Sequence, residues 1–164
     1  CDMSHVVDGK TVYKSYLKER DYKHFGSGDI YSNLLKENFI FTPTVIIRRR
    51  IFDEIKGFDE NYRICEDYKM WLSIARSHSI GYLDEPLVIR RRSDVNITGD
   101  KFLYSFCSVK LLRELRKRET NNKAAKKIIQ ENLKKNYFDL GYWYWKRKNF
   151  LKGAKCIIAS RLSA

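Results

Sequence analysis

The hydrophobic pattern of this 164-residue chain changes at Gly99. Before that glycine, short β-branched runs alternate with short helical patterns, whereas from Lys101 onward the apolar residues recur every three or four positions. Alternating strands and helices are typical of the α/β class, and a sustained helical period is typical of packed helices. The pattern therefore predicts an α/β segment over residues 1–99 and an all-α segment over residues 100–164.

The charge divides at the same place. Residues 1–99 carry 16 lysines and arginines against 15 acids, whereas residues 100–164 carry 17 against 5, out of a net charge of +13. So basic a segment is compatible with a nucleic acid, an anionic membrane or an acidic protein as partner. The sequence contains no zinc finger, ribonucleoprotein motif or G-x-x-G loop, and we do not expect nucleic-acid binding.

The cysteines and the apolar runs indicate in which compartment the protein is located. No apolar run approaches the roughly 18–20 residues of a membrane span. The cysteines lack the close spacing of a zinc site, and free thiols are typical of a reducing compartment, so we predict a cytoplasmic location. The chain begins with a cysteine in an apparent strand already under way, and we expect it to be part of a longer protein. The four cysteines are Cys1, Cys65, Cys107 and Cys156.

Local signals predict how the α/β segment begins. Two β-compatible runs, residues 1–7 and 10–17, flank Asp8-Gly9, a dipeptide that two-residue hairpin turns favour. We therefore expect a hairpin. A polar loop over residues 18–28 follows, which is either a connector or an edge of a binding site. Further expected elements are a helix over residues 30–38 capped by Ser27 or Asp29, a buried strand over 44–48, a helix over 50–55 that Gly57 ends in a left-handed cap, and short strands over 80–83 and 87–89.

An acidic pair, Glu66 and Asp67, precedes an amphipathic pattern that starts at Tyr68. The apolar positions from Tyr68 to Ala75 follow i, i+3, i+4, i+7 spacing, which places the pair in the first turn of a helix. The exposed N–H groups and the dipole of that turn stabilise charged acids by about 0.3–1 kcal/mol. Both side chains are thus candidates for a general base, although acids in a first turn also serve as simple helix caps.

Four short motifs occur in order between residues 39 and 88. The first is a strand motif over residues 39–49, F-I-F-T-P-T-V-I-I-R-R, and the second is the G-F-D-E turn over residues 57–60. The third is the Glu66-Asp67 pair with its aromatic-rich helix, and the fourth is G-Y-L-D-E-P-L-V over residues 81–88. From about residue 1 to 98, the chain resembles the C-terminal, acceptor-side half of a bacterial family 2 glycosyltransferase.

This resemblance implies a partial glycosyltransferase A-type fold, the fold of nucleotide-diphospho-sugar transferases. It also implies inverting transfer of a sugar from a nucleotide-sugar donor to a saccharide or lipid-linked acceptor, in the synthesis of cell-wall or other cell-surface polysaccharide. Asp67 matches the family's catalytic base, with Glu66 orienting the acceptor or supporting Asp67. By the same resemblance, Asp59 and Glu60 line the turn that faces the acceptor. Asp2 resembles the acid of a family strand, without any local feature that supports a role.

Two departures from the family pattern limit what this chain does alone. It contains no D-x-D motif, so the Mg²⁺ or Mn²⁺ ion expected for the full-length enzyme has most of its ligands outside this chain. We assign no metal ligand within it and expect it to be inactive by itself. Ser93 replaces the histidine that often follows the last strand of the family, and Arg90, Arg91 and Arg92 precede it. These arginines either hold the donor diphosphate directly or are merely solvated.

The basic tail over residues 100–164 leaves several interpretations open. We expect two helices separated at Thr120-Asn121-Asn122, and then a spacing of bulky and small residues that resembles a single tetratricopeptide-type helix pair. The tail is a plain helical appendage, or it docks an anionic membrane surface through residues 137–164 at the inner face of the cell membrane, or it binds a nucleic acid or an acidic protein partner. The rival to the enzyme hypothesis is a non-catalytic interaction module built on this tail. The residues with the repeat-like spacing are Tyr137, Leu140, Gly141, Tyr144, Gly153, Ile157 and Ser160.

Overall fold

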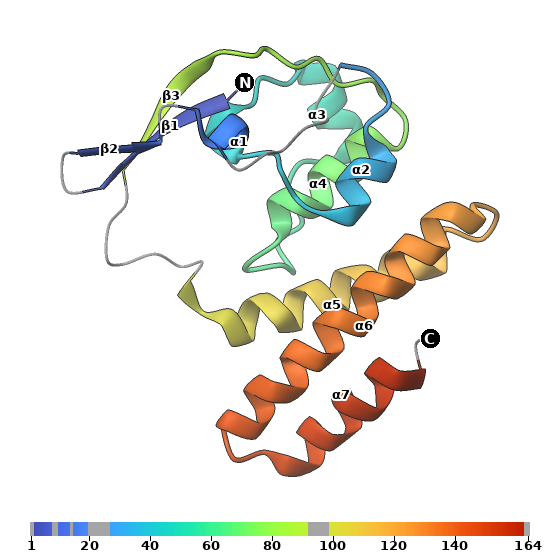
Figure 1. Cartoon of the computed structure of the whole chain (residues 1–164). Helices are drawn as coiled ribbons and strands as arrows, with labels where there is room; N and C mark the ends of the chain where they lie inside the picture. The colour runs from blue at the N-terminus through green and yellow to red at the C-terminus, as the bar shows by residue number, and fades with distance from the viewer. Residues whose placement is uncertain (1, 8–9, 14, 20–26, 92–98, 163–164) are drawn as a thin grey trace. The chain divides into compact units, whose positions relative to one another are not determined.

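The computed structural model describes residues 2–7, 10–13, 15–19, 27–91 and 99–162 of the chain. The chain folds into two compact units (Figure 1). The first unit comprises Cys1–Asp59 and Met70–Asn96, and the second comprises Glu60–Lys69 and Ile97–Ala164. The second unit thus includes ten residues from the middle of the chain besides the basic tail, which the sequence did not indicate.

The first unit contains a three-stranded sheet in the order β2-β1-β3 (Figure 1). β1 (Asp2–Val7) pairs antiparallel with β2 (Lys10–Tyr13) and parallel with β3 (Pro86–Arg91). The pairing of Val7 with Lys10 confirms the predicted hairpin, whose turn residues lie outside the described residues. β3 likewise contains the strand predicted over residues 87–89.

The helices of the first unit cover an apolar core. They are α1 (Tyr16–Glu19), α2 (Tyr31–Lys36), the 3₁₀ helix η1 (Thr42–Thr44), α3 (Arg49–Ile55) and the greater part of α4 (Glu66–Ala75). The helices predicted at α2, α3 and α4 are confirmed. Asp29 accepts a hydrogen bond from the Tyr31 N–H at 3.1 Å, as expected of a capping side chain. The most deeply buried side chains include Met3, Leu34, Leu35, Met70 and Leu72.

Three predicted strand segments are wrong. The second strand of the hairpin ends at Tyr13, and residues 16–17 begin α1. Residues 44–48 do not form a buried strand, because η1 and an irregular stretch occupy them and Ile46 is fully exposed. Within residues 80–83, pairing is confined to an isolated bridge between Ile80 and Gly28. β-branched residues favour a strand only where a neighbouring strand pairs with them, and the described residues offer none to the 44–48 segment.

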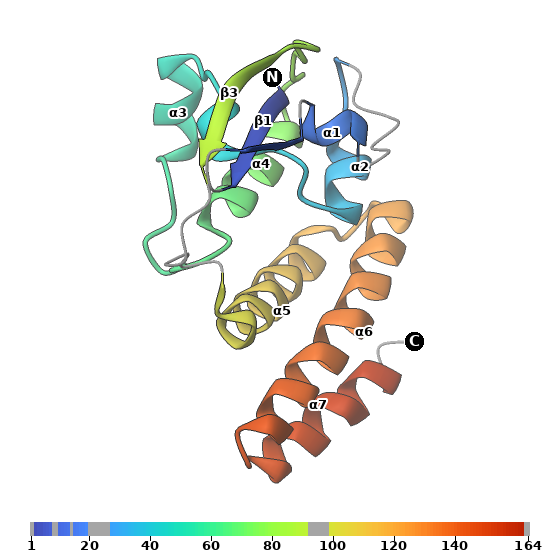
Figure 2. The same ribbon diagram turned by 60° about the vertical axis from the view of Figure 1, so that its left-hand side comes forward.

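The second unit is built on α5 (Lys101–Arg118), α6 (Lys123–Lys146) and α7 (Phe150–Leu162), with α6 packed against both others (Figure 2). Asp100 and Asn122 cap α5 and α6 by accepting N–H groups of the first turns at 3.0 and 2.9 Å. The helix break predicted at residues 120–122 is confirmed. The core includes Leu111, Leu112, Ile129 and Leu133, all of them buried.

α6 and α7 approach closely at two glycines. A Cβ atom on Gly141 would lie 2.8 Å from a side-chain carbon of Ile157 and 3.1 Å from the carbonyl oxygen of Gly153. No side chain fits there without moving the helices apart. In the described part of the chain, no helix combines the length and the apolar character needed to cross a membrane.

Candidate functional site

The acidic pair lies where the sequence places it, in the first turn of α4. Cys65 precedes the helix in the left-handed conformation, with φ of 70°, and its carbonyl accepts the Lys69 N–H at 2.9 Å. Glu66 and Asp67 are half-buried, and the Asp67 Oδ1 atom accepts the Tyr68 N–H at 2.6 Å. A rare backbone conformation at Cys65 thus fixes where the helix starts and where its two carboxylates project.

A polar cluster holds the segment around this pair on α5. We call Tyr62, Lys69, Lys110 and Glu114 the Tyr62 cluster. The Tyr62 ring is 3 % exposed, and the ammonium nitrogens of Lys69 and Lys110 lie 4.4 and 4.3 Å from its centroid. The Tyr62 hydroxyl donates to Glu114 at 2.8 Å, and Lys69 Nζ donates to the other Glu114 oxygen at 2.7 Å. Lys69 is two residues beyond Asp67, so the cluster restrains the turn that carries the pair.

Electrostatics favour the charged form of Glu114. Partial burial acts to raise the pKa of this carboxyl group, but hydrogen bonds from Lys69 and Tyr62 and the positive charges of Lys69 and Lys110 outweigh it. The net effect is a lowered pKa. Glu114 therefore remains a carboxylate in the folded unit, and it is the anion that the two lysines share.

Cys65 is a packing residue and not a nucleophile. Burial is the main cause that raises the pKa of its thiol to about 12. The hydrogen bond with the Ser108 hydroxyl opposes this rise, and Cys107, Asp67 and Glu66 add smaller effects in the same direction as burial. The Cys65 sulfur lies 3.7 Å from the Ser108 hydroxyl oxygen on α5. A thiol with such a pKa stays protonated near neutral pH, and the thiolate is the reactive form.

The G-F-D-E turn follows α3 as predicted. Lys56 and Gly57 both adopt left-handed conformations, with φ of 65° and 69°, and the Gly57 N–H donates to the Phe52 carbonyl at 3.0 Å. The Phe58 ring makes edge contacts with the rings of Phe52 and Trp71, each at 6.2 Å between centroids. These contacts fix the start of the turn from which Asp59 and Glu60 project.

The remaining predicted site residues are divided between the units. Asp59 is half-buried and belongs to the first unit, as does Arg90, which is half-buried on β3 opposite His5. Glu60 is exposed and belongs to the second unit together with the acidic pair. Arg91 ends β3, but its side chain lies outside the described residues, and so does the whole of Arg92.

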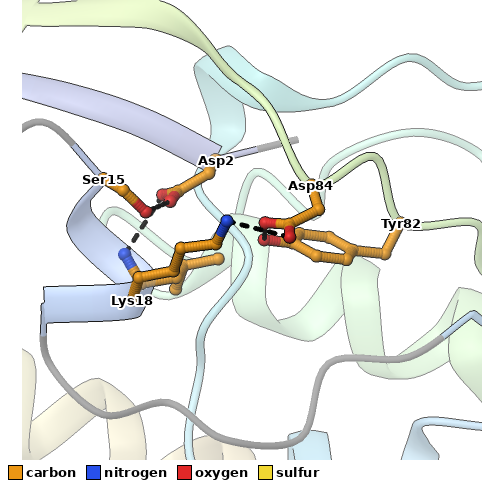
Figure 3. A network of polar contacts seen from close by, with 6 residues as sticks. Asp2, Ser15, Lys18, Tyr82 and Asp84 are labelled. Carbon is orange, nitrogen blue, oxygen red and sulfur yellow. Dashed lines mark hydrogen bonds and ion pairs between the residues drawn. The ribbon is translucent and has the colours of Figure 1, made fainter.

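A second polar network is centred on Asp2, which is 1 % exposed. Its carboxylate accepts hydrogen bonds from the Met3 N–H at 2.7 Å and from the Leu17 N–H at 3.1 Å. It also accepts one from the Ser15 hydroxyl (Figure 3). Its own N–H donates to the Glu85 carbonyl at 3.1 Å. Asp2 thereby joins β1, the start of α1 and the segment before β3, and this bonding explains why the chain turns into a helix at residue 16 instead of continuing as a strand.

The D-E-P motif contributes the outer part of this network. Lys18 Nζ pairs with Asp84 at 2.9 Å, and the Tyr82 hydroxyl donates to the same carboxylate at 3.2 Å (Figure 3). Burial raises the pKa of Tyr82 to about 12, and the negative charges of Asp84 and Asp2 add to the effect. The hydrogen bond and charge of Lys18 lower the pKa of Asp84. This network was not predicted from the sequence, although a hairpin that pairs Val7 with Lys10 already brings Ser15 close to the start of β1.

A cavity in the first unit has a volume of ≈ 590 Å³ and is mainly apolar. No aspartate or glutamate is among the described residues that line it, and His78 is the one histidine among them. Trp71 lines it and is 2 % exposed, and its indole N–H has no hydrogen-bond partner among the residues that the structure describes. In the same residues, no group of three or more histidine, cysteine, aspartate or glutamate side chains is placed to hold a metal ion.

Two known proteins are similar to this chain. One is described as an uncharacterized glycosyltransferase of Rickettsia felis, and it is 34% identical over 96 residues. The other is described as an uncharacterized glycosyltransferase of Rickettsia conorii, and it is 33% identical over 96 residues. The chain is thus related to proteins named as glycosyltransferases.

The similarity covers part of each molecule. The matched region is 58% of this chain and 15% of each relative, so the chain spans a small fraction of the length of the relatives it matches. No protein-family model matches the sequence. No solved structure matches it either.

Proposed function

We propose that this chain supplies the acceptor side and the catalytic base of an inverting sugar transferase. The observation that carries the proposal is the acidic pair at the start of α4, in a turn restrained by the Tyr62 cluster and preceded by a left-handed residue. The names of the two Rickettsia relatives support sugar transfer in general. Family 2 membership, the A-type fold and a role in cell-surface polysaccharide synthesis are part of the proposal.

In this proposal Asp67 takes the proton from the acceptor hydroxyl as that oxygen attacks the anomeric carbon of the donor sugar. Inversion follows because the nucleotide diphosphate leaves from the opposite face of the ring. A general base must reach its proton within hydrogen-bond distance, and a partly exposed carboxylate in a fixed helical turn meets that need. Glu66 orients the acceptor, and Asp59 and Glu60 contribute to its binding surface.

The described residues do not bring three potential ligands together, so they contain no site for the expected Mg²⁺ or Mn²⁺ ion. We therefore derive no step of this chain's chemistry through a metal. We propose instead that Arg90 of β3 contacts the donor diphosphate. Arg91 and Arg92 follow it in the sequence. A guanidinium group binds a diphosphate through two parallel hydrogen bonds, which a lysine cannot reproduce.

The proposed location is cytoplasmic, with peripheral binding to an anionic membrane surface through the second half of the tail. Phe138, Tyr142 and Trp145 are exposed at i, i+4, i+7 on one face of α6, and Phe150 is exposed at the start of α7. Exposed cations lie at the end of α6 and the start of α7, and each contributes about 1 kcal/mol to membrane binding near acidic lipid. These cations are Lys146, Arg147, Lys148 and Lys152.

The test is sugar transfer by the longer protein that contains this region, with Asp67→Asn introduced. Loss of one general base lowers turnover by about 10²–10⁴-fold, while the affinity for the nucleotide stays nearly unchanged. Asp53→Asn is the matched control, because Asp53 is an exposed helical aspartate paired only with Arg49 among the described side chains. Retained turnover in Asp67→Asn, or an equal loss in the control, removes Asp67 as the base.

A further inference from the structure

The second unit contains a groove that the proposed sugar transfer does not use. It has a volume of ≈ 420 Å³ and is lined by α5, α6 and α7. Its volume lies in the range of about 300–1,000 Å³ that is typical of ligand sites. Its floor is apolar and aromatic, formed by Phe106, Val109, Tyr137, Leu140 and Tyr144.

Cations surround this floor on two sides. Lys110, Arg113 and Lys117 line the groove from α5, and Lys152 and Lys155 line it from α7. Glu114 is the one acid among the described lining residues, and both of its oxygens are already bonded within the Tyr62 cluster. Five positive charges around one concave surface repel each other, and an anionic ligand would relieve this repulsion.

Four of the five cations form no ion pair with the residues that the structure describes. Lys110 donates to the Asn61 carbonyl at 3.1 Å and packs on the Tyr62 ring, so the Tyr62 cluster occupies it. Arg113, Lys117, Lys152 and Lys155 are exposed and form no ion pair within the described ranges of the chain. They are therefore available for the carboxylates of a partner.

The arrangement of these charges indicates an extended ligand. The lining residues of α5 run from Phe106 to Lys117, which is about 16 Å of helix. An extended peptide covers that length with about five residues. A site for a single phosphate group would have its cations at one point, whereas here the cations lie along α5 and α7 on both sides of the groove. Distributed charge suits a chain with acids at intervals and apolar side chains between them.

The aromatic floor argues against single-stranded nucleic acid as the occupant. Nucleic-acid sites of this kind offer open ring faces on which bases stack. Here the Phe106 ring already stacks on Phe102 at 6.4 Å, and the Lys152 ammonium group lies over the Tyr144 ring at 5.8 Å. Two of the three aromatic rings of the floor therefore already have a ring or a cation against them.

We propose that the groove between α5, α6 and α7 binds an extended acidic peptide segment of another protein, with carboxylates on the two cationic walls and apolar side chains on the floor. The proposal does not require sugar transfer, since it uses neither the acidic pair nor the first unit, although Lys110 and Glu114 of the Tyr62 cluster also line the groove.

The experiment is fluorescence anisotropy of the whole chain with a labelled peptide of alternating glutamate and leucine. The acidic peptide should bind and its glutamine counterpart should not. Arg113→Glu combined with Lys155→Glu should weaken binding by about tenfold or more. Lys127→Glu combined with Lys134→Glu is the matched control, because these exposed α6 residues change the net charge equally but do not line the groove. The control should retain most of the binding.

Alkylation of Cys156 gives a second reading, because this half-buried thiol lines the groove. Bound peptide should slow its alkylation, followed by mass spectrometry. Equal weakening by both charge-reversal pairs, or absence of protection at Cys156, overturns the proposal. The proposal is also overturned if a single-stranded oligothymidylate or phosphatidylserine vesicles bind more tightly than the acidic peptide and the groove variant abolishes that binding. The occupant would then be a nucleic acid or a membrane.

Discussion

Replacing Glu114 with glutamine tests whether the Tyr62 cluster holds the acidic segment on α5. Glutamine keeps the size of the side chain but removes the charge that Lys69 and Lys110 share. Lys69 is only 14 % exposed and would lose its counter-ion, whereas Glu114 itself is 36 % exposed and partly screened by water. Hydrogen bonds to charged groups contribute about 1.5–3 kcal/mol, and screening together with the remaining amide oxygen reduces the loss to about 1–2 kcal/mol.

The effect has a defined pH dependence. The pKa of Glu114 is lowered in the folded chain relative to its ordinary value of 4.5, so the folded state binds a proton less readily than the unfolded state. The stability that Glu114 contributes is therefore fully present above the unfolded pKa of 4.5, and it is lost as the pH falls through the lower folded pKa. Wild type and Glu114→Gln should differ most near neutral pH and converge in acid.

Urea unfolding followed by circular dichroism measures the loss of stability in Glu114→Gln and its dependence on pH. Glu131→Gln is the control, because Glu131 is exposed on α6 and none of the ion pairs among the described residues includes it. A double-mutant cycle with Lys69→Met should give a coupling of about 1 kcal/mol. The reasoning is refuted if Glu114→Gln is as neutral as the control, or if its cost is the same in acid as at neutral pH.

Three further predictions concern the second unit. Gly141→Ala should destabilise the chain by about 1–3 kcal/mol because its Cβ would lie 2.8 Å from Ile157, while Gly81→Ala, which meets nothing within 4 Å, should be tolerated in the same urea titration. Cys65, with a pKa of about 12, should resist iodoacetamide in the folded chain and react after unfolding, as read by mass spectrometry; equal rates would contradict its burial. Trp145→Ala with Phe150→Ala should reduce cosedimentation with phosphatidylserine vesicles, and unchanged binding would refute the membrane surface.

The helices were more predictable from the sequence than the strands, for a physical reason. The signals for α4, α5 and α6 are local, because they consist of apolar periodicity and of caps such as Asn122, which accepts the Ala125 N–H at 2.9 Å. A strand also needs a partner that the local sequence does not contain. β1 and β2 are only two residues apart in the sequence, and their pairing was predicted correctly although β2 is shorter than expected. The β-branched segment after Pro43 lacks a described partner and stays irregular.

The candidate site was likewise predictable from the sequence only where its signals are local. The position of Glu66 and Asp67 in a first helical turn follows from local spacing, and the structure places them there. The groups that restrain that turn come from α5, and the hydrogen bond from Tyr62 to Glu114 spans 52 positions of the chain. In the sequence, Glu114 was simply one of five acids in a basic tail. No periodicity or spacing rule assigns one of those acids to a tyrosine so distant in the chain.

This long-range bonding changes the interpretation of the tail. A helical appendage that only follows the acidic segment would leave Glu60–Lys69 unaffected by its removal. Here α5 instead provides the carboxylate that binds Tyr62 and Lys69, the lysine that bonds to the Asn61 carbonyl, and the serine beside Cys65. The segment that carries the proposed base therefore depends on the basic tail for its conformation. A cut at Gly99 should release the first turn of α4, even though every residue of that turn remains in the chain.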